Sequence, residues 1–358
     1  MNDALLYRRQ VGLWLAICAA TILGMILLGG VTRLTNSGLS MVEWRPLLGI
    51  IPPLNHEQWL DVFAKYKTSP EYQIVNAGMS LAEFKYIFMY EYLHRVLGRI
   101  IGVLFFVPYA YFLLKGRIPD GYRVKLALLF VLGGCQGLLG WFMVKSGLVD
   151  DPRVSHYRLT AHLGLAVLIF GFMIWLTSSL LDSRHEQHAA SAVPPWLGRL
   201  AAAVAILIYL MILSGGLVAG SRAGYAWSTW PLMGDSFIPP GLYATAPAWL
   251  AAFEDITTIQ FNHRIFAYFI ALLGGGLALA VLRLSQDRLA RVAAGLFTLL
   301  LTTQITLGVI TILYHVPIAA AAAHQVVGVS LFASAIYLAR RLLIMEPLGS
   351  EKKSQFPT

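Results

Sequence analysis

Long apolar stretches separated by shorter polar segments form the dominant pattern of this chain. Eight of them have the length of about 20 residues that a helix needs to cross the hydrocarbon core of a bilayer. Only isolated polar residues interrupt these stretches, so the pattern predicts an all-α integral membrane protein with eight transmembrane helices. The predicted spans are residues 11–31, 86–114, 124–146, 158–181, 199–220, 258–282, 291–314 and 318–342.

Composition supports this prediction, because 58% of the residues are hydrophobic and only 13% are charged, which is far from the balance of a soluble domain. The first ten residues contain basic side chains but no cleavage signal, so we expect the first span to be retained. The lack of a long Arg- and Ser-rich leader favours a bacterial plasma (inner) membrane.

The distribution of Lys and Arg predicts the orientation of the spans. Fifteen of these residues lie on the side that holds both termini, against nine in the longer segments of the other side. Basic residues favour the cytoplasmic face, so both termini are predicted to be cytoplasmic. The net charge of +9 then reflects membrane topology, and no basic tract with interleaved aromatics indicates nucleic-acid binding.

Residues 28–53 align with residues 214–240, since each segment leaves a span with Gly-Gly and ends in Ile-Pro-Pro. Each half contains four spans, an even number, so the repeat is parallel. We therefore expect two four-helix bundles related by a pseudo-twofold axis along the membrane normal. The predicted division is an N-terminal half 1–182, a cytoplasmic linker 183–198, a C-terminal half 199–345 and a cytoplasmic tail 346–358.

The two long outer loops are amphipathic at residues 55–73 and 246–255, which predicts short helices over the outer face of the membrane. Such helices could simply cover the helix ends or could take part in substrate entry. The two cysteines, Cys18 and Cys135, both fall inside predicted spans. They are therefore interpreted as packing residues rather than as disulfide or metal-binding residues.

Four of the nine histidines lie a few residues inside spans two, four, six and eight, which all run from the outside to the inside. Ionisable side chains within a membrane are costly, and they mark a site or an interhelical hydrogen bond. Two imidazoles on facing helices can bind haem iron from both sides. The prediction is two haem sites near the outer face, one in each half, formed by His94 with His162 and by His263 with His324.

A zinc site is the weaker alternative, because each half offers two histidines and no cysteine or second carboxylate beside them. Arginines also gather at the outer ends of the same helices. Their guanidinium groups could bind haem propionates or could simply reach the lipid phosphates. These arginines are Arg33, Arg95, Arg99, Arg222 and Arg264.

The two halves differ one helical turn before the first histidine of each, where Glu91 precedes His94 but Gln260 precedes His263. Residues three apart share a helix face. A carboxylate beside one haem only suggests that the first site carries chemistry and the second passes electrons. The alternative is that Glu91 simply pairs with Arg95 or with a neighbouring helix.

The chain resembles the haem A synthases over nearly its whole length, through "GGVTRLTNSGLSMVEWRPLLG", "EYLHRVLGR", "RLTAHLG", "QFNHRIFAY" and "AAAHQVVG". The resemblance implies an oxidoreductase that converts the methyl group at carbon eight of haem O to the formyl group of haem A, for cytochrome oxidase assembly. It implies that His94 and His162 flank the substrate haem, with Glu91 as the catalytic carboxylate. It also implies that His263 and His324 bind a permanent haem b.

The outer loops contain no cysteine, so the chain resembles the cysteine-lacking branch of that family, shared by bacteria and mitochondria. Arg264 and Arg222 are the arginines assigned to binding of the haem b cofactor. Haem O synthase and an electron-transfer protein are partners that the family implies. Outward-facing small residues would suit a homo-oligomer within the membrane lipid, although the sequence does not decide the oligomeric state.

Two other functions were weighed against this one. A bis-histidine transmembrane haem b electron carrier without haem modification would place its haems near opposite faces of the membrane, whereas all four histidines here lie near one face. A transporter built on a repeat is disfavoured because the repeat is parallel and mid-span charge is absent.

Overall fold

The structure is a computed structural model that describes residues 3–43, 50–148, 152–182 and 193–344. Within these ranges the protein is all-helical, and the eight long apolar helices confirm the eight predicted spans, with ends that differ by a few residues. They are α1 (Asp3–Leu34), α4 (Leu81–Leu114), α5 (Arg123–Lys145), α6 (His156–Leu181), α7 (Pro195–Ser221), α9 (Ile256–Leu284), α10 (Arg288–Leu313) and α11 (Ile318–Leu343).

Local sequence signals account for where these helices begin. Ser80 and Glu83 form a reciprocal capping box at the start of α4. Asp255 caps α9 and Asp287 caps α10 through their side chains. Each of these contacts satisfies backbone N–H groups that have no partner within the helix.

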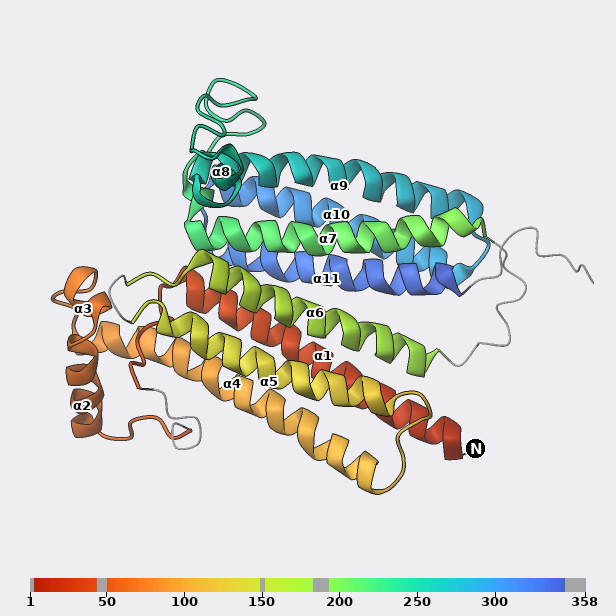
Figure 1. The fold of residues 1–358 in the computed structure, drawn as a ribbon, viewed down its shortest axis with the longest axis horizontal. Helices are drawn as coiled ribbons and strands as arrows, with labels where there is room; N and C mark the ends of the chain where they lie inside the picture. The colour runs from red at the N-terminus through yellow and green to blue at the C-terminus, as the bar shows by residue number, and fades with distance from the viewer. Residues whose placement is uncertain (1–2, 44–49, 149–151, 183–192, 345–358) are drawn as a thin grey trace, which may run out of the picture.

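Short helices occupy the outer loops, as predicted. The first loop holds α2 (His56–Lys67) and α3 (Pro70–Ile74), and the second holds a 3-10 turn (Ala223–Tyr225) and α8 (Ala248–Glu254). Figure 1 shows α2, α3 and α8 at the same end of the long helices. This end is the one that we call the outer end.

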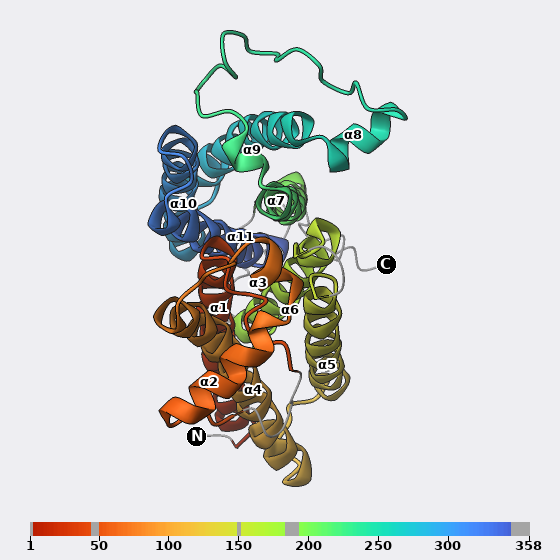
Figure 2. The same cartoon turned by 90° about the vertical axis from the view of Figure 1, so that its left-hand side faces the viewer.

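The eight long helices form two groups of four (Figures 1 and 2). In the first group α1 and α5 each contact both α4 and α6, and in the second α7 and α10 each contact both α9 and α11. The order of neighbours is therefore the same in both groups. The groups meet where α6 contacts α7 and α11, and where α1 contacts α11. The pseudo-twofold axis along the membrane normal stays a prediction.

Large apolar side chains cover the outside of the long helices. Leu138 on α5, Leu272 on α9 and Leu299 on α10 are all more than half exposed. Exposed apolar surface on this scale is unfavourable in water but is matched by lipid. The protein is therefore a multi-pass membrane protein.

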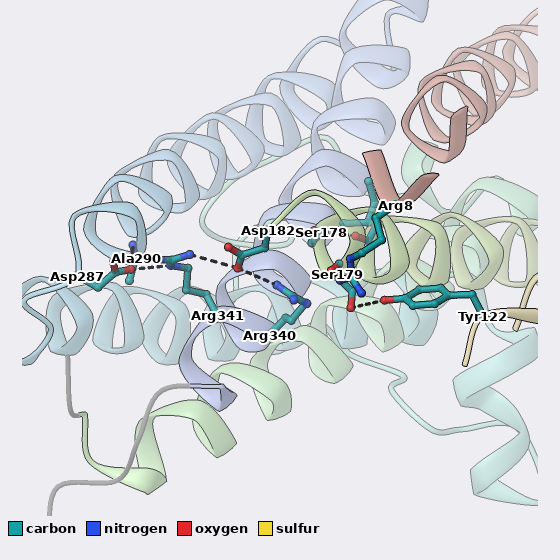
Figure 3. A network of polar contacts seen from close by, with 10 residues as sticks. Arg8, Tyr122, Ser178, Ser179, Asp182, Asp287, Ala290, Arg340 and Arg341 are labelled. Carbon is teal, nitrogen blue, oxygen red and sulfur yellow. Dashed lines mark hydrogen bonds and ion pairs between the residues drawn. The ribbon is translucent and has the colours of Figure 1, made fainter. Parts of the chain in front are cut away.

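A charged cluster joins the two groups at the end opposite the short helices (Figure 3). Arg341 of α11 donates two hydrogen bonds to Asp287, at 2.6 Å from Nε and 2.8 Å from Nη2. Arg340 and Arg341 also reach Asp182, which follows α6, at 3.3 and 3.4 Å. Both arginines are buried. The pairs with Asp182 hold α11 against the first group, and the pair with Asp287 joins α11 to α10 within the second group.

The predicted division between the halves is only partly covered by the described residues. α7 begins at Pro195, four residues earlier than the predicted start of the second half at residue 199. Residues 183–192 of the predicted linker and the predicted tail 346–358 lie outside the described residues.

Candidate functional site

In the first half, each predicted haem-binding histidine rests against a glycine of the preceding long helix. A Cβ placed on Gly29 of α1 would lie 3.1 Å from Nε2 of His94 on α4. One on Gly140 of α5 would lie 2.9 Å from Cε1 of His162 on α6. Contacts this short would force the ring or the helix to move, so these glycines create the space that the imidazoles occupy.

The second half repeats this arrangement. A Cβ on Gly215 of α7 would lie 3.4 Å from Cε1 of His263 on α9, and one on Gly308 of α10 would lie 3.0 Å from Cε1 of His324 on α11. We call the four glycines of both halves the imidazole seats. Each of the four histidines therefore contacts a glycine of the preceding long helix.

The histidines are also brought together in the predicted pairs. His94 is close enough to His162 to interact with it electrostatically, and His263 is in the same relation to His324. Each pair joins the second and fourth long helices of its own group. Each half therefore brings together two imidazoles from separate helices.

Hydrogen bonds to the rings differ between the halves. In the second half Ser214 Oγ lies 3.1 Å from Nδ1 of His263, and Nδ1 of His324 lies 3.1 Å from the backbone carbonyl of Gln304. In the first half the Nε2 amide of Gln136 lies 3.1 Å from Nδ1 of His162. His94 has no hydrogen-bond partner among the residues that the structure describes.

The second glycine of each Gly-Gly pair faces the other half of the molecule. A Cβ on Gly30 would lie 2.2 Å from Oε1 of Gln325 on α11, and one on Gly216 would lie 3.1 Å from Oγ1 of Thr160 on α6. Gln325 also donates a 3.1 Å hydrogen bond to the carbonyl of Ile26. Each Gly-Gly pair therefore serves the imidazole of its own half and the close approach of the two halves.

Glu91 is buried on α4 beneath the first outer loop, with 3% of its surface exposed. Its Oε2 accepts hydrogen bonds from Ser40 Oγ at 2.7 Å and from the backbone N–H of Met41 at 2.9 Å. Its Oε1 forms an ion pair with Arg95 Nη2 at 2.5 Å. The pairing with Arg95, which the sequence left open, is therefore present, and it fixes the carboxylate in one position.

The corresponding residues of α9 bind the second outer loop through backbone carbonyls. Gln260 donates to the carbonyl of Trp227 at 3.0 Å. Arg264 donates to the same carbonyl at 2.9 Å and to those of Thr229 and Leu232 at 2.8 and 3.3 Å. Both terminal nitrogens of Arg264 are thus engaged with the loop, and its binding to a haem propionate stays a prediction.

Arg222 adopts a left-handed conformation, with φ of 61°, at the end of α7. Its Nη2 donates to Oδ1 of Asn36 in the first half at 2.9 Å. In the reverse direction, Arg33 at the end of α1 donates to the carbonyls of Ala219 and Gly220 at 3.1 and 3.3 Å. The two arginines join the halves at the outer end, and the predicted role of Arg222 in cofactor binding stays a prediction.

Comparison with known proteins identifies the family. A family profile described as cytochrome oxidase assembly protein matches residues 12–336. Heme A synthase of Nitrosospira multiformis is 46% identical over 335 residues, which cover 94% of each chain. Heme A synthase of Paramagnetospirillum magneticum is 49% identical over 331 residues, or 90% of this chain and 91% of the relative. This chain belongs to the haem A synthase family.

Membership of the haem A synthase family implies that haem is involved, and the residues present fit such a group. Each half offers two imidazoles, one glycine seat for each ring, and a helical wall around them. No group of three or more His, Cys, Asp or Glu side chains able to hold a metal ion occurs among the described residues. A pair of imidazoles suits haem iron, which needs only two axial ligands from the protein.

Several residues of this site were missed by sequence reasoning. The sequence "QGLLG" at residues 136–140 recurs as "QITLG" at residues 304–308, but the sequence analysis gives no role to Gln136 or Gln304. Both show Gln-x-x-x-Gly spacing, which places the amide and the seat glycine on one helix face a turn apart. That spacing could have indicated a common imidazole partner. Ser214 and Ser40 carry no sequence signal of this kind.

Proposed function

We propose that this haem A synthase family member oxidises the methyl group at carbon eight of haem O to the formyl group of haem A. Two rounds of oxidation are needed. Each breaks one C–H bond of this carbon, adds the oxygen of one water molecule, and releases two electrons and two protons, one from the carbon and one from the water. The resulting geminal diol loses water to give the formyl group. The electrons pass to an electron-transfer partner, which the family resemblance implies.

In this proposal His94 and His162 hold the substrate haem in the first half. Their glycine seats set the position of the two rings, so α4 and α6 would hold the substrate haem through these imidazoles. The same helix, α4, carries Glu91 one turn closer to the outer end than His94. This places a carboxylate beside only one of the two sites.

Glu91 supplies a fixed negative charge that stabilises positive charge on the carbon being oxidised. Ser40, Met41 and Arg95 hold the carboxylate, so it need not reorganise as charge develops. Preorganised charge of this kind is an effective source of catalysis in a site shielded from water. The second half has Gln260 at the matching position, and a neutral amide offers no such stabilisation.

His263 and His324 hold a permanent haem b in the second half. When bound there, haem b supplies one-electron transfer between the substrate site and the partner protein. Arg264 stabilises this site through the second outer loop that it binds, and Arg222 lies at the junction with the first half. The substrate haem O comes from a haem O synthase, and we place the protein in the bacterial inner membrane with both termini in the cytoplasm.

The observation that carries this proposal is the presence of two seated imidazole pairs, of which only one has a neighbouring buried carboxylate. A bis-histidine electron carrier without haem modification would have no need for this asymmetry. The relatives that cover most of this chain are named haem A synthases, and they give no support to the electron carrier.

Haem analysis of the purified protein tests the proposal. The protein is expressed in a host that makes haem O, and the extracted haems are identified by chromatography with mass detection. We expect haem b together with haem O, a hydroxylated intermediate or haem A. In a His263→Ala variant we expect haem b to be lost while some haem O remains. Haem b alone in the unaltered protein would contradict the proposal.

A further inference from the structure

The four imidazoles differ in the hydrogen-bond partner of Nδ1, the ring nitrogen that is not expected to bind iron. A histidine that binds iron through Nε2 carries its hydrogen on Nδ1, so an oxygen at Nδ1 can accept that hydrogen. Such a contact fixes the tautomer and the ring orientation, and it makes the imidazole a stronger ligand. The partner of Nδ1 therefore affects how firmly each half retains its haem.

Both histidines of the second half have oxygen at Nδ1. Ser214 Oγ lies 3.1 Å from Nδ1 of His263, and the backbone carbonyl of Gln304 lies 3.1 Å from Nδ1 of His324. The amide nitrogen of Gln304 also approaches Nε2 of His324, at 3.3 Å. That amide can rotate away when iron binds, and the carbonyl contact at Nδ1 is retained.

Neither histidine of the first half has this kind of partner among the described residues. The group at Nδ1 of His162 is the amide nitrogen of Gln136, at 3.1 Å, which can only donate. The same amide nitrogen also lies 3.4 Å from Nε2 of His162, so it offers neither ring nitrogen an acceptor. Iron binding to His162 requires this contact to break or the amide to rotate.

The internal repeat shows which residue of the first half corresponds to Ser214, the hydrogen-bond partner of His263. Gly29 and Gly215 are equivalent seats, so Leu28 stands in the first half where Ser214 stands in the second. Leucine has no group that could accept the hydrogen of Nδ1. The equivalent glycines meet different edges of the two rings, Nε2 of His94 at Gly29 and Cε1 of His263 at Gly215. Among the described residues only His263 has a hydroxyl at its Nδ1.

We propose that Ser214 is a positioning residue that makes the haem of the second half permanent, and that Leu28 at the equivalent place leaves the haem of the first half exchangeable. This rests on the proposed function, which assigns a retained cofactor to one half and a substrate and product that must enter and leave to the other. The difference in retention then comes from hydrogen bonds to the ligands rather than from the ligands themselves.

Transfer of haem to excess apomyoglobin tests the role of Ser214. The detergent-purified full-length protein is mixed with apomyoglobin, and haem b and haem O are followed separately by chromatography. In Ser214→Ala we expect haem b to leave about tenfold faster, because loss of a ligand's hydrogen-bond partner typically weakens metal binding by 10- to 100-fold. The midpoint potential of haem b should rise, since a weaker donor stabilises ferric iron less.

Two variants separate this role from a general effect on α7. Ser214→Thr keeps a hydroxyl and should restore slow transfer and the original potential. Ser221→Ala removes a hydroxyl of the same helix. That hydroxyl donates to the carbonyl of Leu217 and accepts from the backbone N–H of Ala223, and it contacts neither histidine of the second half. This change should leave both readouts unchanged. Equal transfer rates in Ser214→Ala and Ser221→Ala would overturn the proposal.

The reciprocal change places a hydroxyl in the first half. Leu28→Ser should slow the transfer of haem O about tenfold, whereas Leu27→Ser, on the exposed side of α1, should not. An unchanged haem O rate in Leu28→Ser would overturn the role given to Leu28. If Ser214→Ala instead released haem O, the hydrogen-bond role would stand, and the assignment of haem b to the second half in the proposed function would fail.

Discussion

The two halves of this protein share a scaffold and differ in the groups around it. Both have the same order of helix neighbours, two histidines on glycine seats, and a polar pair on the second long helix that binds the outer loop. The first half has Glu91 where the second has Gln260, and Leu28 where the second has Ser214. A duplicated bundle can therefore hold the same kind of group twice and give each copy a different task through its neighbours.

Replacing Glu91, the carboxylate that distinguishes the two halves, should reduce haem A formation more than any other change. In Glu91→Gln the first half gains the residue type of the second, and we expect haem A formation to fall by about 10²- to 10³-fold because a preorganised charge is lost. Haem content is measured in the same preparation. Glu57→Gln, an exposed residue of α2, is the control. Unchanged haem A formation with both haems bound would show that Glu91 is not catalytic.

Filling one imidazole seat should affect one half only. In Gly140→Ala the added Cβ meets the ring of His162 at 2.9 Å, so we expect first-half haem binding to weaken by about tenfold or more. Gly308→Ala should do the same to the second half. Haem b and haem O contents of the two variants measure this selectivity. Loss of both haems to the same extent in either variant would contradict independent seats.

Gly133→Ala is the control for the Gly→Ala changes at the imidazole seats, because its Cβ would meet nothing within 4 Å. It lies on the same helix as Gly140, and the change should stabilise that helix by about 1 kcal/mol because alanine has the higher helix propensity. Gly215→Ala should be the mildest of the seat variants, since its Cβ would lie 3.4 Å from the ring of His263. A haem loss in Gly133→Ala equal to that in Gly140→Ala would rule out the steric explanation.

The first outer loop should lose stability as the pH rises. Burial raises the pKa of Glu71 in α3 to about 7, from an ordinary value of 4.5, and Tyr66 donates a 3.0 Å hydrogen bond to its carboxylate. The folded loop therefore holds this proton more tightly than the unfolded loop does. Its stability should fall by up to about 3 kcal/mol as the pH rises from about 4.5 to about 7, and should then stay level.

Hydrogen exchange of α2 and α3 as a function of pH measures this loss of stability. Glu71→Gln should abolish the dependence on pH. Hydrogen exchange of α8 in the second outer loop, measured over the same pH range, is the comparison. A slope of the same size in Glu71→Gln would assign the effect to another group.

Much of the fold could be predicted because apolar length is a local property of the chain. The eight spans and the short helices of the outer loops were found from sequence, since a bilayer requires about 20 apolar residues and amphipathic stretches favour an interface. The histidines were found because an ionisable residue inside a span is conspicuous. The pairing of Glu91 with Arg95 also follows from their spacing of four residues on one helix.

Contacts between helices could not be predicted, because spacing along one helix does not say what another helix presents to it. Arg264 illustrates this limit, because its position gave no indication that its guanidinium binds three carbonyls of the second outer loop. Ser214 and Gln136 meet their histidines only because α7 lies against α9 and α5 lies against α6.

The sequence by itself determined that this protein crosses the membrane eight times, that its halves repeat, and that each half carries two histidines near one face. These properties depend on residue type and on distance along the chain. The tertiary structure decided which glycine receives each imidazole, which oxygen meets its Nδ1, and how Glu91 is held. Those relations arise where separate helices come within a few ångströms of each other, and only packing sets such distances.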